Sequence, residues 1–363
     1  MNKKFLGMTA VAILWLALAA WAWLRPADSF SDTERRPLAQ FPAVESESVL
    51  KGKFMTDFES YALDQFPLRN TFRQLKARVH YGLLGQRDNN GIYLADGYAA
   101  KLEYPLNEDS VAHALQVFNK IRGKYLEPSA VFLAVVPDKS YYLGRKNGYP
   151  VMDYEKMLQM LREGMPYASY VNLTDQLDAT SYYKTDTHWR QESLLPAAQK
   201  LCAALGVTPP AAADYRQTLL SSAFYGVYYG QAALPMEPDT LTVLESDLLE
   251  RCTVYNHETG KSGSIYDRSK LTGKDLYEVF LSGSVSLLTI ENPDAQTDRE
   301  LIIFRDSFGS SLAPLLVQGY KTVTLIDIRY LSSAMLSRFV DFHGQDVLFL
   351  YSTLVLNNSA ALQ

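Results

Sequence analysis

The chain has 363 residues, of which 47% are hydrophobic, 12% aromatic and 21% charged, and its formal net charge is −5. This length suits one large domain or two small ones built around a substantial hydrophobic core. The mild negative charge and the absence of a long Lys/Arg run exclude a surface built for nucleic acid, so we expect no nucleic-acid partner.

The N-terminus carries a short basic flank, residues 1–4, followed by twenty uncharged residues from Phe5 to Leu24. Twenty helical residues are long enough to cross a bilayer core of about 30 Å. Lysines before such a span favour a cytoplasmic N-terminus. The pattern predicts a single-pass protein of the cell membrane, with the rest of the chain outside the cytoplasm. A cleaved signal peptide and a secreted protein are the alternative, because small residues such as Ala20 and Ala22 could form a cleavage site.

Residues 25–48 contain three prolines among charged and small residues and are predicted to be a linker. Apolar residues then recur at helical spacing, which predicts a helical extension over residues 49–88. We treat this extension as the first part of one domain that occupies residues 49–363.

Predicted strands and helices alternate through most of the remaining chain. Residues 131–136 form a continuous apolar run that suits a buried parallel strand, and the apolar residues 301–304 predict a second buried strand over 301–306. Other strands are expected at 92–94, 170–173, 322–326 and 347–351, and helices at 110–125, 152–165, 189–205, 311–317 and 332–339. This alternation predicts an α/β fold with a doubly wound sheet. Residues 212–295, rich in Tyr, Ser, Gly and Thr, are predicted to be an insertion of loops and short strands.

Two segments carry residues suited to acyl transfer. Ser307 follows a predicted strand and precedes a helix, at the edge where open α/β sheets carry their sites. Asp186 and His188 lie two residues apart, before a second predicted helix. A serine hydroxyl needs a base, and the base needs an acid that fixes its tautomer. We therefore expect Ser307 to be a nucleophile, His188 its base and Asp186 the group that orients the base.

Each of these residues also has a purely structural interpretation, as do the two cysteines. Ser307 could be a helix N-cap, and Asp186 or its neighbour could cap the next helix and leave His188 on the surface. Asp-x-His offers only two metal ligands, so we expect neither a metal site nor a cofactor. Cys202 and Cys252 could pair outside the cytoplasm or could both be small buried residues.

The segment 183–189, Tyr-Lys-Thr-Asp-Thr-His-Trp, resembles the signature of extracytoplasmic DHHW-type proteins and of the related alginate O-acetylation proteins, both SGNH-hydrolase-like. Thr187 stands where the DHHW name implies a second histidine, whereas the alginate-type pattern carries Asp-Thr-His-Trp. The resemblance covers the chain from about residue 50 onward, because other segments are also similar to family segments: 64–69, 90–94, 136–139 and 305–308.

The resemblance implies a flavodoxin-like SGNH domain whose triad is Ser307, His188 and Asp186, in an order permuted relative to ordinary SGNH enzymes. In the alginate-type relatives such a triad moves acetyl groups onto an exported polysaccharide. There a multi-spanning membrane O-acyltransferase supplies acetyl across the membrane. The resemblance thus implies a membrane-anchored O-acetyltransferase that acts on a cell-surface or exported polysaccharide, with such an acyltransferase as its partner.

Two other functions remain open: a carbohydrate esterase with the same triad, and a non-catalytic protein for glycan binding or envelope assembly. The non-catalytic function is supported by one feature of the sequence, because Arg305 replaces the glycine of the SGNH Gly-Asp-Ser motif. We assign Tyr225 and Gly226 in the predicted insertion, together with Arg305, as candidates for binding the oxyanion or the substrate. Lys139 and Trp189 lie in segments that resemble the family, and they are further candidates for these contacts.

Overall fold

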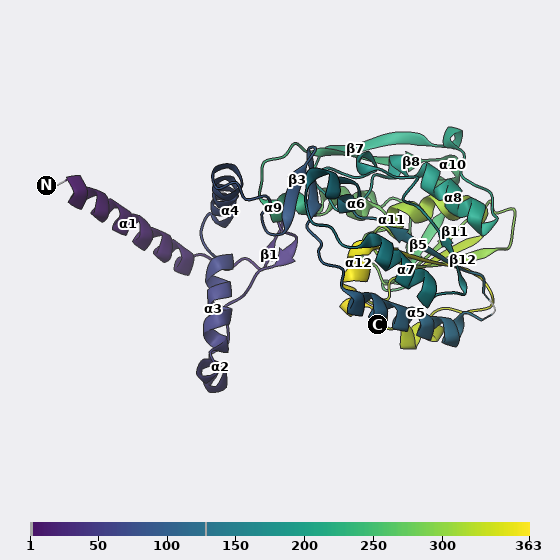
Figure 1. Ribbon diagram of the computed structural model, residues 1–363, viewed down its shortest axis with the longest axis horizontal. Helices are drawn as coiled ribbons and strands as arrows, with labels where there is room; N and C mark the ends of the chain where they lie inside the picture. The colour runs from purple at the N-terminus through teal and green to yellow at the C-terminus, as the bar shows by residue number, and fades with distance from the viewer. Residues whose placement is uncertain (1–2, 128) are drawn as a thin grey trace. The chain divides into compact units, whose positions relative to one another are not determined.

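The computed structural model describes residues 3–127 and 129–363 (Figure 1). Residues 1 and 2 of the expected basic flank lie outside the described residues. The chain divides into two compact units. The N-terminal unit contains residues up to Asn90 together with Tyr229–Pro235, and the α/β unit contains Gly91–Tyr228 and Met236–Gln363.

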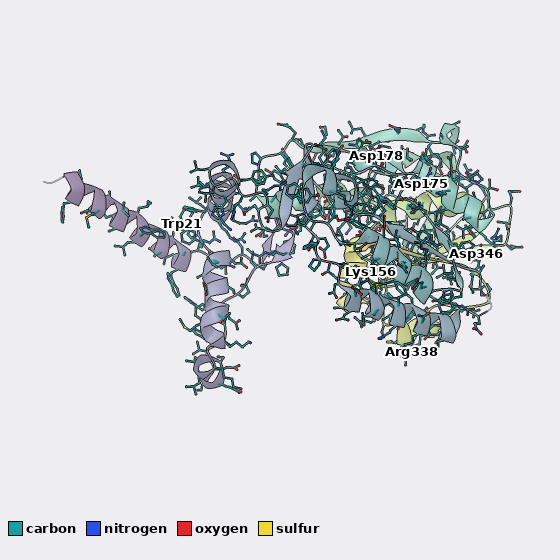
Figure 2. The ribbon with its side chains drawn as sticks, viewed as in Figure 1. Trp21, Lys156, Asp175, Asp178, Arg338 and Asp346 are labelled. Atoms are coloured by element: carbon teal, nitrogen blue, oxygen red, sulfur yellow. The ribbon has the colours of Figure 1, made fainter. Side chains whose placement is uncertain are left out.

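The N-terminal unit begins with one long apolar helix, α1 (Lys3–Leu24). Its segment Phe5–Leu24 has a mean hydropathy of 2.0 and is 6% buried. Trp21 and other side chains project from this helix, and Trp21 is 47% exposed (Figure 2). By length and composition, α1 could cross a membrane, although a signal sequence has the same properties.

The segment predicted to be a linker contains a short hairpin, β1 (Phe30–Ser31) with β2 (Arg36–Pro37), and runs into α2 (Ser46–Leu50). It is followed by α3 (Lys53–Asp64), α4 (Arg69–Arg78) and a π-helical turn over Val79–Leu83. Arg36 ties the hairpin to the end of α3, because its Nη2 lies 2.5 Å from Asp64 Oδ1. The hydrogen bond from Arg36 lowers the pKa of the Asp64 carboxyl.

An eight-stranded sheet forms the centre of the α/β unit, in the order β10-β9-β11-β13-β12-β14-β5-β6. The five strands from β13 to β6 are parallel, and β10, β9 and β11 continue the sheet antiparallel. Their bounds are β5 (Val131–Val136), β6 (Ala168–Val171), β9 (Thr253–Asn256), β10 (Lys261–Gly263), β11 (Leu287–Glu291), β12 (Glu300–Arg305), β13 (Thr322–Ile326) and β14 (Asp346–Ser352).

Helices cover both faces of this sheet. Successive residues of β5 point to opposite faces of the sheet. Leu133 belongs to a buried cluster with Phe118 of α5, whereas Ala134 belongs to a second cluster with Leu201 of α8. One face is covered by α5 (Glu108–Tyr125), α7 (Tyr154–Gly164) and α12 (Thr353–Asn357), and the other by α8 (Leu195–Leu205) and the 3₁₀ helix Ala313–Gly319. The predicted α/β class with a doubly wound sheet is confirmed.

The prediction that residues 212–295 form one insertion is wrong in part. The strands β9, β10 and β11 fall in this range, and they extend the main sheet. Only β7 (Arg216–Phe224) and β8 (Asp239–Glu245) form a separate hairpin. The turn signals between these short strands conceal the pairing, which joins β11 to a strand more than thirty residues later in the chain.

One helix start was predicted too early. The helix expected at 189–205 begins only at Leu195, because Trp189 forms a β-bridge with Tyr182 and Pro196 is suited to the first helical turn. The helices expected at 311–317 and 332–339 are largely 3₁₀. The remaining elements are β3 (Ile92–Ala95), β4 (Tyr98–Lys101), α6 (Lys139–Leu143), α9 (Val227–Ala232), α10 (Asp247–Arg251) and α11 (Gly309–Leu312).

The two cysteines are free, and both are buried. Burial raises the pKa of the Cys202 thiol to about 12 and that of Cys252 to about 11. Of the two interpretations of the sequence, the structure therefore shows small buried residues rather than a disulfide.

Candidate active site

Ser307 lies in the tight turn between β12 and α11. Asp306 shapes this turn, because its Oδ1 accepts from the Phe308 N–H at 3.0 Å and its Oδ2 accepts from the Ser352 N–H at 2.8 Å. The second bond ties the turn to the end of the neighbouring strand β14. The N-cap position of α11 is Phe308. Ser307 therefore does not act as the helix cap that the structural interpretation required.

His188 connects Ser307 to Asp186. Its Nε2 lies 2.8 Å from Ser307 Oγ, and its Nδ1 lies 2.6 Å from Asp186 Oδ1. Asp186 is fully buried, and its carboxylate also accepts the N–H groups of His188 at 3.0 Å and Val227 at 2.8 Å. Since a carboxylate only accepts hydrogen bonds, the imidazole proton is placed on Nδ1. The Nε2 lone pair then faces the serine hydroxyl.

A second carboxylate, that of Asp239 at the start of β8, holds the loop that carries Asp186. It accepts from the N–H groups of Lys184 and Thr185, each at 2.8 Å, and from the Thr185 hydroxyl at 2.6 Å. Sequence reasoning missed Asp239, because a lone acidic residue far along the chain carries no motif. Its buried position is decided by the pairing of β7 with β8.

Aromatic residues fix the imidazole and join its loop to the serine turn. The Tyr277 ring stacks on His188 with centroids 3.8 Å apart and an interplanar angle of 8°. Its hydroxyl lies 2.8 Å from Ser311 Oγ, to which the Trp189 indole N–H also donates at 2.9 Å. Trp189 is fully buried, so it acts as a link between the loops rather than as a substrate contact. The sequence offered no signal for Tyr277, one of 24 tyrosines.

Arg305 and Lys139, two predicted substrate contacts, are both buried. Arg305 donates to the Val285 carbonyl at 3.1 Å and lies 3.7 Å from the carboxylate of Asp327. It thus connects β12 to the chain beyond β13, and the assignment to the substrate is wrong. Lys139 Nζ donates to the carbonyl of Tyr183 at 2.8 Å and therefore supports the Asp186 loop from inside.

Gly226 was predicted to bind an oxyanion, and the structure gives it another role. Its N–H donates to Thr185 Oγ1 at 2.9 Å, so this donor is already used. A Cβ on Gly226 would lie 2.2 Å from the Cβ of Asp186, and only glycine allows so close an approach.

Tyr225 beside Gly226 is 42% exposed and remains a candidate substrate contact. Across residues 3–127 and 129–363, the Ser307 N–H has no acceptor and is available as a donor to an oxyanion.

Replacing Gly226 with alanine should destabilise the site and reduce activity. The added methyl group must displace Asp186, and overpacking of this kind costs about 1–3 kcal/mol. Gly123 in α5 is the matched control, since a Cβ there meets nothing within 4 Å. Gly123→Ala should raise the free energy of unfolding by about 0.5–1 kcal/mol. Denaturant unfolding of both variants tests this, and equal effects at the two positions would contradict it.

The buried ammonium of Lys139 should make stability depend on pH. Burial lowers the Lys139 pKa from its usual 10.5 to about 7. At pH values between about 7 and 10.5, Lys139 carries a proton in the unfolded chain but not in the folded chain. The free energy of unfolding should therefore rise with pH in this range. The expected rise is on the order of a few kcal/mol. Unfolding at several pH values should show a flatter slope for Lys139→Met, whereas Lys156→Met at an exposed site should keep the wild-type slope.

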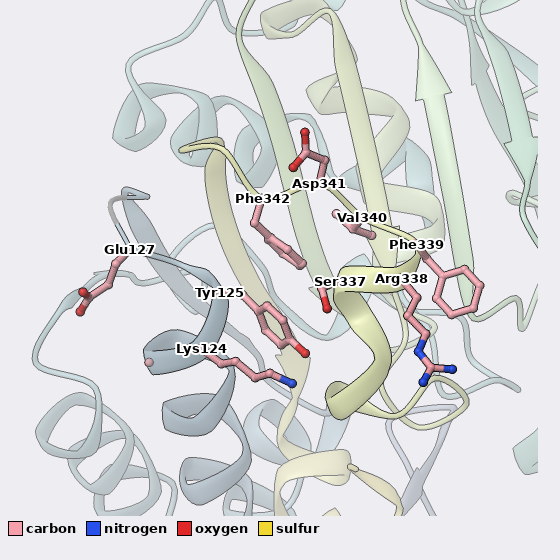
Figure 3. Close-up of a pocket in the computed structure, with 10 residues that line it drawn as sticks. Lys124, Tyr125, Glu127, Ser337, Arg338, Phe339, Val340, Asp341 and Phe342 are labelled. Atoms are coloured by element: carbon pink, nitrogen blue, oxygen red, sulfur yellow. The ribbon is translucent and has the colours of Figure 1, made fainter.

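A surface cavity of about 590 Å³ lies away from these residues (Figure 3). Its lining comes from the end of α5, including Tyr125, and from the segment 337–342, including Phe342. Both segments precede parallel strands, β5 and β14, whereas Ser307 follows β12. The cavity therefore belongs to the amino-end edge of the sheet, and the chain from Ser307 to Asp186 belongs to the opposite edge, where open α/β sheets carry their sites.

Comparisons with known proteins agree with this fold. The model of the family described as DHHW protein matches residues 152–326. A DHHW family protein of Eubacterium siraeum is 22% identical, with a TM-score of 0.62 over 76% of this chain and 95% of that one. PatB1 of Bacillus cereus is 17% identical, with a TM-score of 0.59 over 73% of this chain and 96% of that one. A second PatB1 structure contains a sulfonyl adduct and has 16% identity and a TM-score of 0.56, covering 73% and 94% of the two chains.

No curated protein matches the chain. The structural similarities are below 25% identity, and they bear on the fold. The family match spans the segment that contains Asp186, His188 and Ser307. Residues 152–326 of this chain are therefore similar to DHHW proteins, and its α/β fold is similar to that of the solved DHHW and PatB1 structures.

Proposed function

We propose that this protein is a membrane-anchored O-acetyltransferase that modifies a cell-surface or exported polysaccharide outside the cytoplasm. The observation that carries the proposal is the hydrogen-bonded chain from Ser307 Oγ through His188 to Asp186, with distances of 2.8 and 2.6 Å. A nucleophile, a base and an orienting acid are the parts that acyl transfer through serine needs. The resemblance of the Asp-Thr-His-Trp segment to the alginate-type proteins supports acetyl as the group and a polysaccharide as the acceptor.

In the first half-reaction, Ser307 Oγ attacks the carbonyl carbon of an acetyl donor while His188 Nε2 takes the hydroxyl proton. The Ser307 N–H binds the oxyanion of the tetrahedral intermediate. Its collapse breaks the bond to the donor, whose leaving group takes the proton from His188, and an acetyl ester remains on Ser307. A sugar hydroxyl then gives its proton to His188 and attacks this ester, which releases the acetylated sugar and regenerates the serine.

The helix α1 supports the location. Lysine before an apolar span favours a cytoplasmic N-terminus, which supports a position of the α/β unit outside the cytoplasm. A polysaccharide at the cell surface is then accessible, whereas cytoplasmic acetyl donors are not. A membrane-bound O-acyltransferase that passes acetyl across the bilayer is the partner that this arrangement requires.

The test uses the full-length protein in nanodiscs with an activated acetyl ester as donor and oligosaccharides as acceptors. Mass spectrometry should detect acetylated oligosaccharide, and Ser307→Ala should form none. Acetate release without acetylated sugar would identify a carbohydrate esterase instead. A sulfonyl fluoride should label wild type at Ser307, a choice of reagent suggested by the sulfonyl adduct of PatB1. No labelling and no turnover would favour the non-catalytic, glycan-binding function.

A further inference from the structure

In the N-terminal unit, α4 and its flanking turns carry an apolar stripe that faces outward. The stripe consists of Leu68, Phe72, Leu75, Val79 and Leu83, which are 37–78% exposed. Their spacing of three and four residues places them along one side of the helix. A stripe of this kind normally packs against the core of its own domain. Here it is left uncovered.

The opposite side of α4 packs against its own unit. Ala77, which lies between Leu75 and Val79 in sequence but on the other side of the helix, is fully buried. Arg73 on the same inner side donates to the Gly230 carbonyl at 3.0 Å and lies 3.2 Å from the Glu34 carboxylate. Turning the helix to bury the apolar stripe would break these contacts. The contacts of Arg73 and Ala77 therefore hold α4 in the orientation that exposes the apolar stripe.

The surroundings of the stripe point to a lipid bilayer as its partner. Phe72 contacts Phe66 with ring centroids 5.4 Å apart, and Phe66 contacts Trp15 of α1 at 6.4 Å. The stripe is thus connected through aromatic rings to the helix that is long and apolar enough to span a membrane. The exposed Lys76 and Arg78 in the last turn of α4 add positive charge, as in helices that bind anionic lipid surfaces.

We propose that the segment 68–84 lies flat on the outer leaflet of the bilayer that α1 spans. The apolar stripe enters the boundary between headgroups and acyl chains, and Lys76 and Arg78 lie near lipid phosphates. The inference rests on the proposed anchoring by α1. It adds a second membrane attachment, which holds the N-terminal unit at the bilayer surface instead of on a free tether.

The experiment uses full-length protein in nanodiscs of anionic lipid, with the nitroxide near the lipid headgroups to report on positions 75 and 83 and in the middle of the acyl chains to report on position 14. A fluorophore is attached at Leu75→Cys or Leu83→Cys in the stripe. Leu14→Cys in α1 reports anchoring, and Gln74→Cys is the control on the same helix, exposed but off the stripe. Unsubstituted protein measures background labelling of Cys202 and Cys252, which are buried.

Labels at positions 75 and 83 should be quenched at least about twofold more than the label at 74, since interfacial helices enter the bilayer by about 5–10 Å. Quenching at 14 without quenching at 75 and 83 would overturn this inference and leave the anchor standing. No quenching at 14 would instead count against the anchor itself. Labels at 75 and 83 that are shielded from both nitroxide lipid and aqueous iodide would show that a second copy covers the stripe, which also overturns the proposal.

Discussion

Ser307→Ala should lower acetyl transfer by at least about 10³-fold without unfolding the protein. The hydroxyl supplies the attacking oxygen, and its structural contact is a single hydrogen bond to His188. The turn itself is held by Asp306, whose bonds to Phe308 and Ser352 the substitution does not touch. Steady-state rates with an acetyl ester and an oligosaccharide, together with thermal melting, measure both parts of this expectation.

Ser337→Ala is the matched control, because Ser337 lies in the surface cavity at the other edge of the sheet (Figure 3). It removes the same oxygen and should leave the rate unchanged. A Ser307→Ala protein that retained full activity would show that the hydrogen-bonded serine is not the nucleophile. The proposed function would then have to be abandoned.

Asp186→Asn should reduce the rate by about 10⁴-fold, the size of effect expected when the orienting acid of a triad is lost. The two carboxylate oxygens accept hydrogen bonds from His188 and from the N–H of Val227. An asparagine presents an NH₂ group on one side, which must face one of these donors. The imidazole then either changes its tautomer or loses its position. Enzyme kinetics measure the loss, and melting temperatures separate it from unfolding.

Asp175→Asn provides a control at a surface carboxylate, which is paired with Lys200 and is exposed rather than buried (Figure 2). Its rate should equal that of wild type. If Asp186→Asn were as active as Asp175→Asn, the buried carboxylate would have only a structural function. The sulfonyl fluoride used above would then still label Ser307 at the normal rate.

Local sequence patterns predicted the parts of this fold that depend on continuous apolar runs. The strands β5, β12, β13 and β14 were expected within a residue or two, because buried parallel strands are dominated by apolar residues. The edge strand β10 and its neighbour β9 were not predicted, because short polar strands resemble loops until their partner strand is known. Their place in the sheet depends on pairing with distant residues.

The sequence by itself determined the α/β class, the apolar N-terminal helix and the residues Asp186, His188 and Ser307, since apolar periodicity and short motifs are local properties. Only the tertiary structure decided how the surrounding residues are used. It buried Arg305 and Lys139, assigned Gly226 to close packing against Asp186, and brought Tyr277 onto the imidazole. These roles depend on distances between segments up to a hundred residues apart, and such distances arise only when the sheet and its loops have packed.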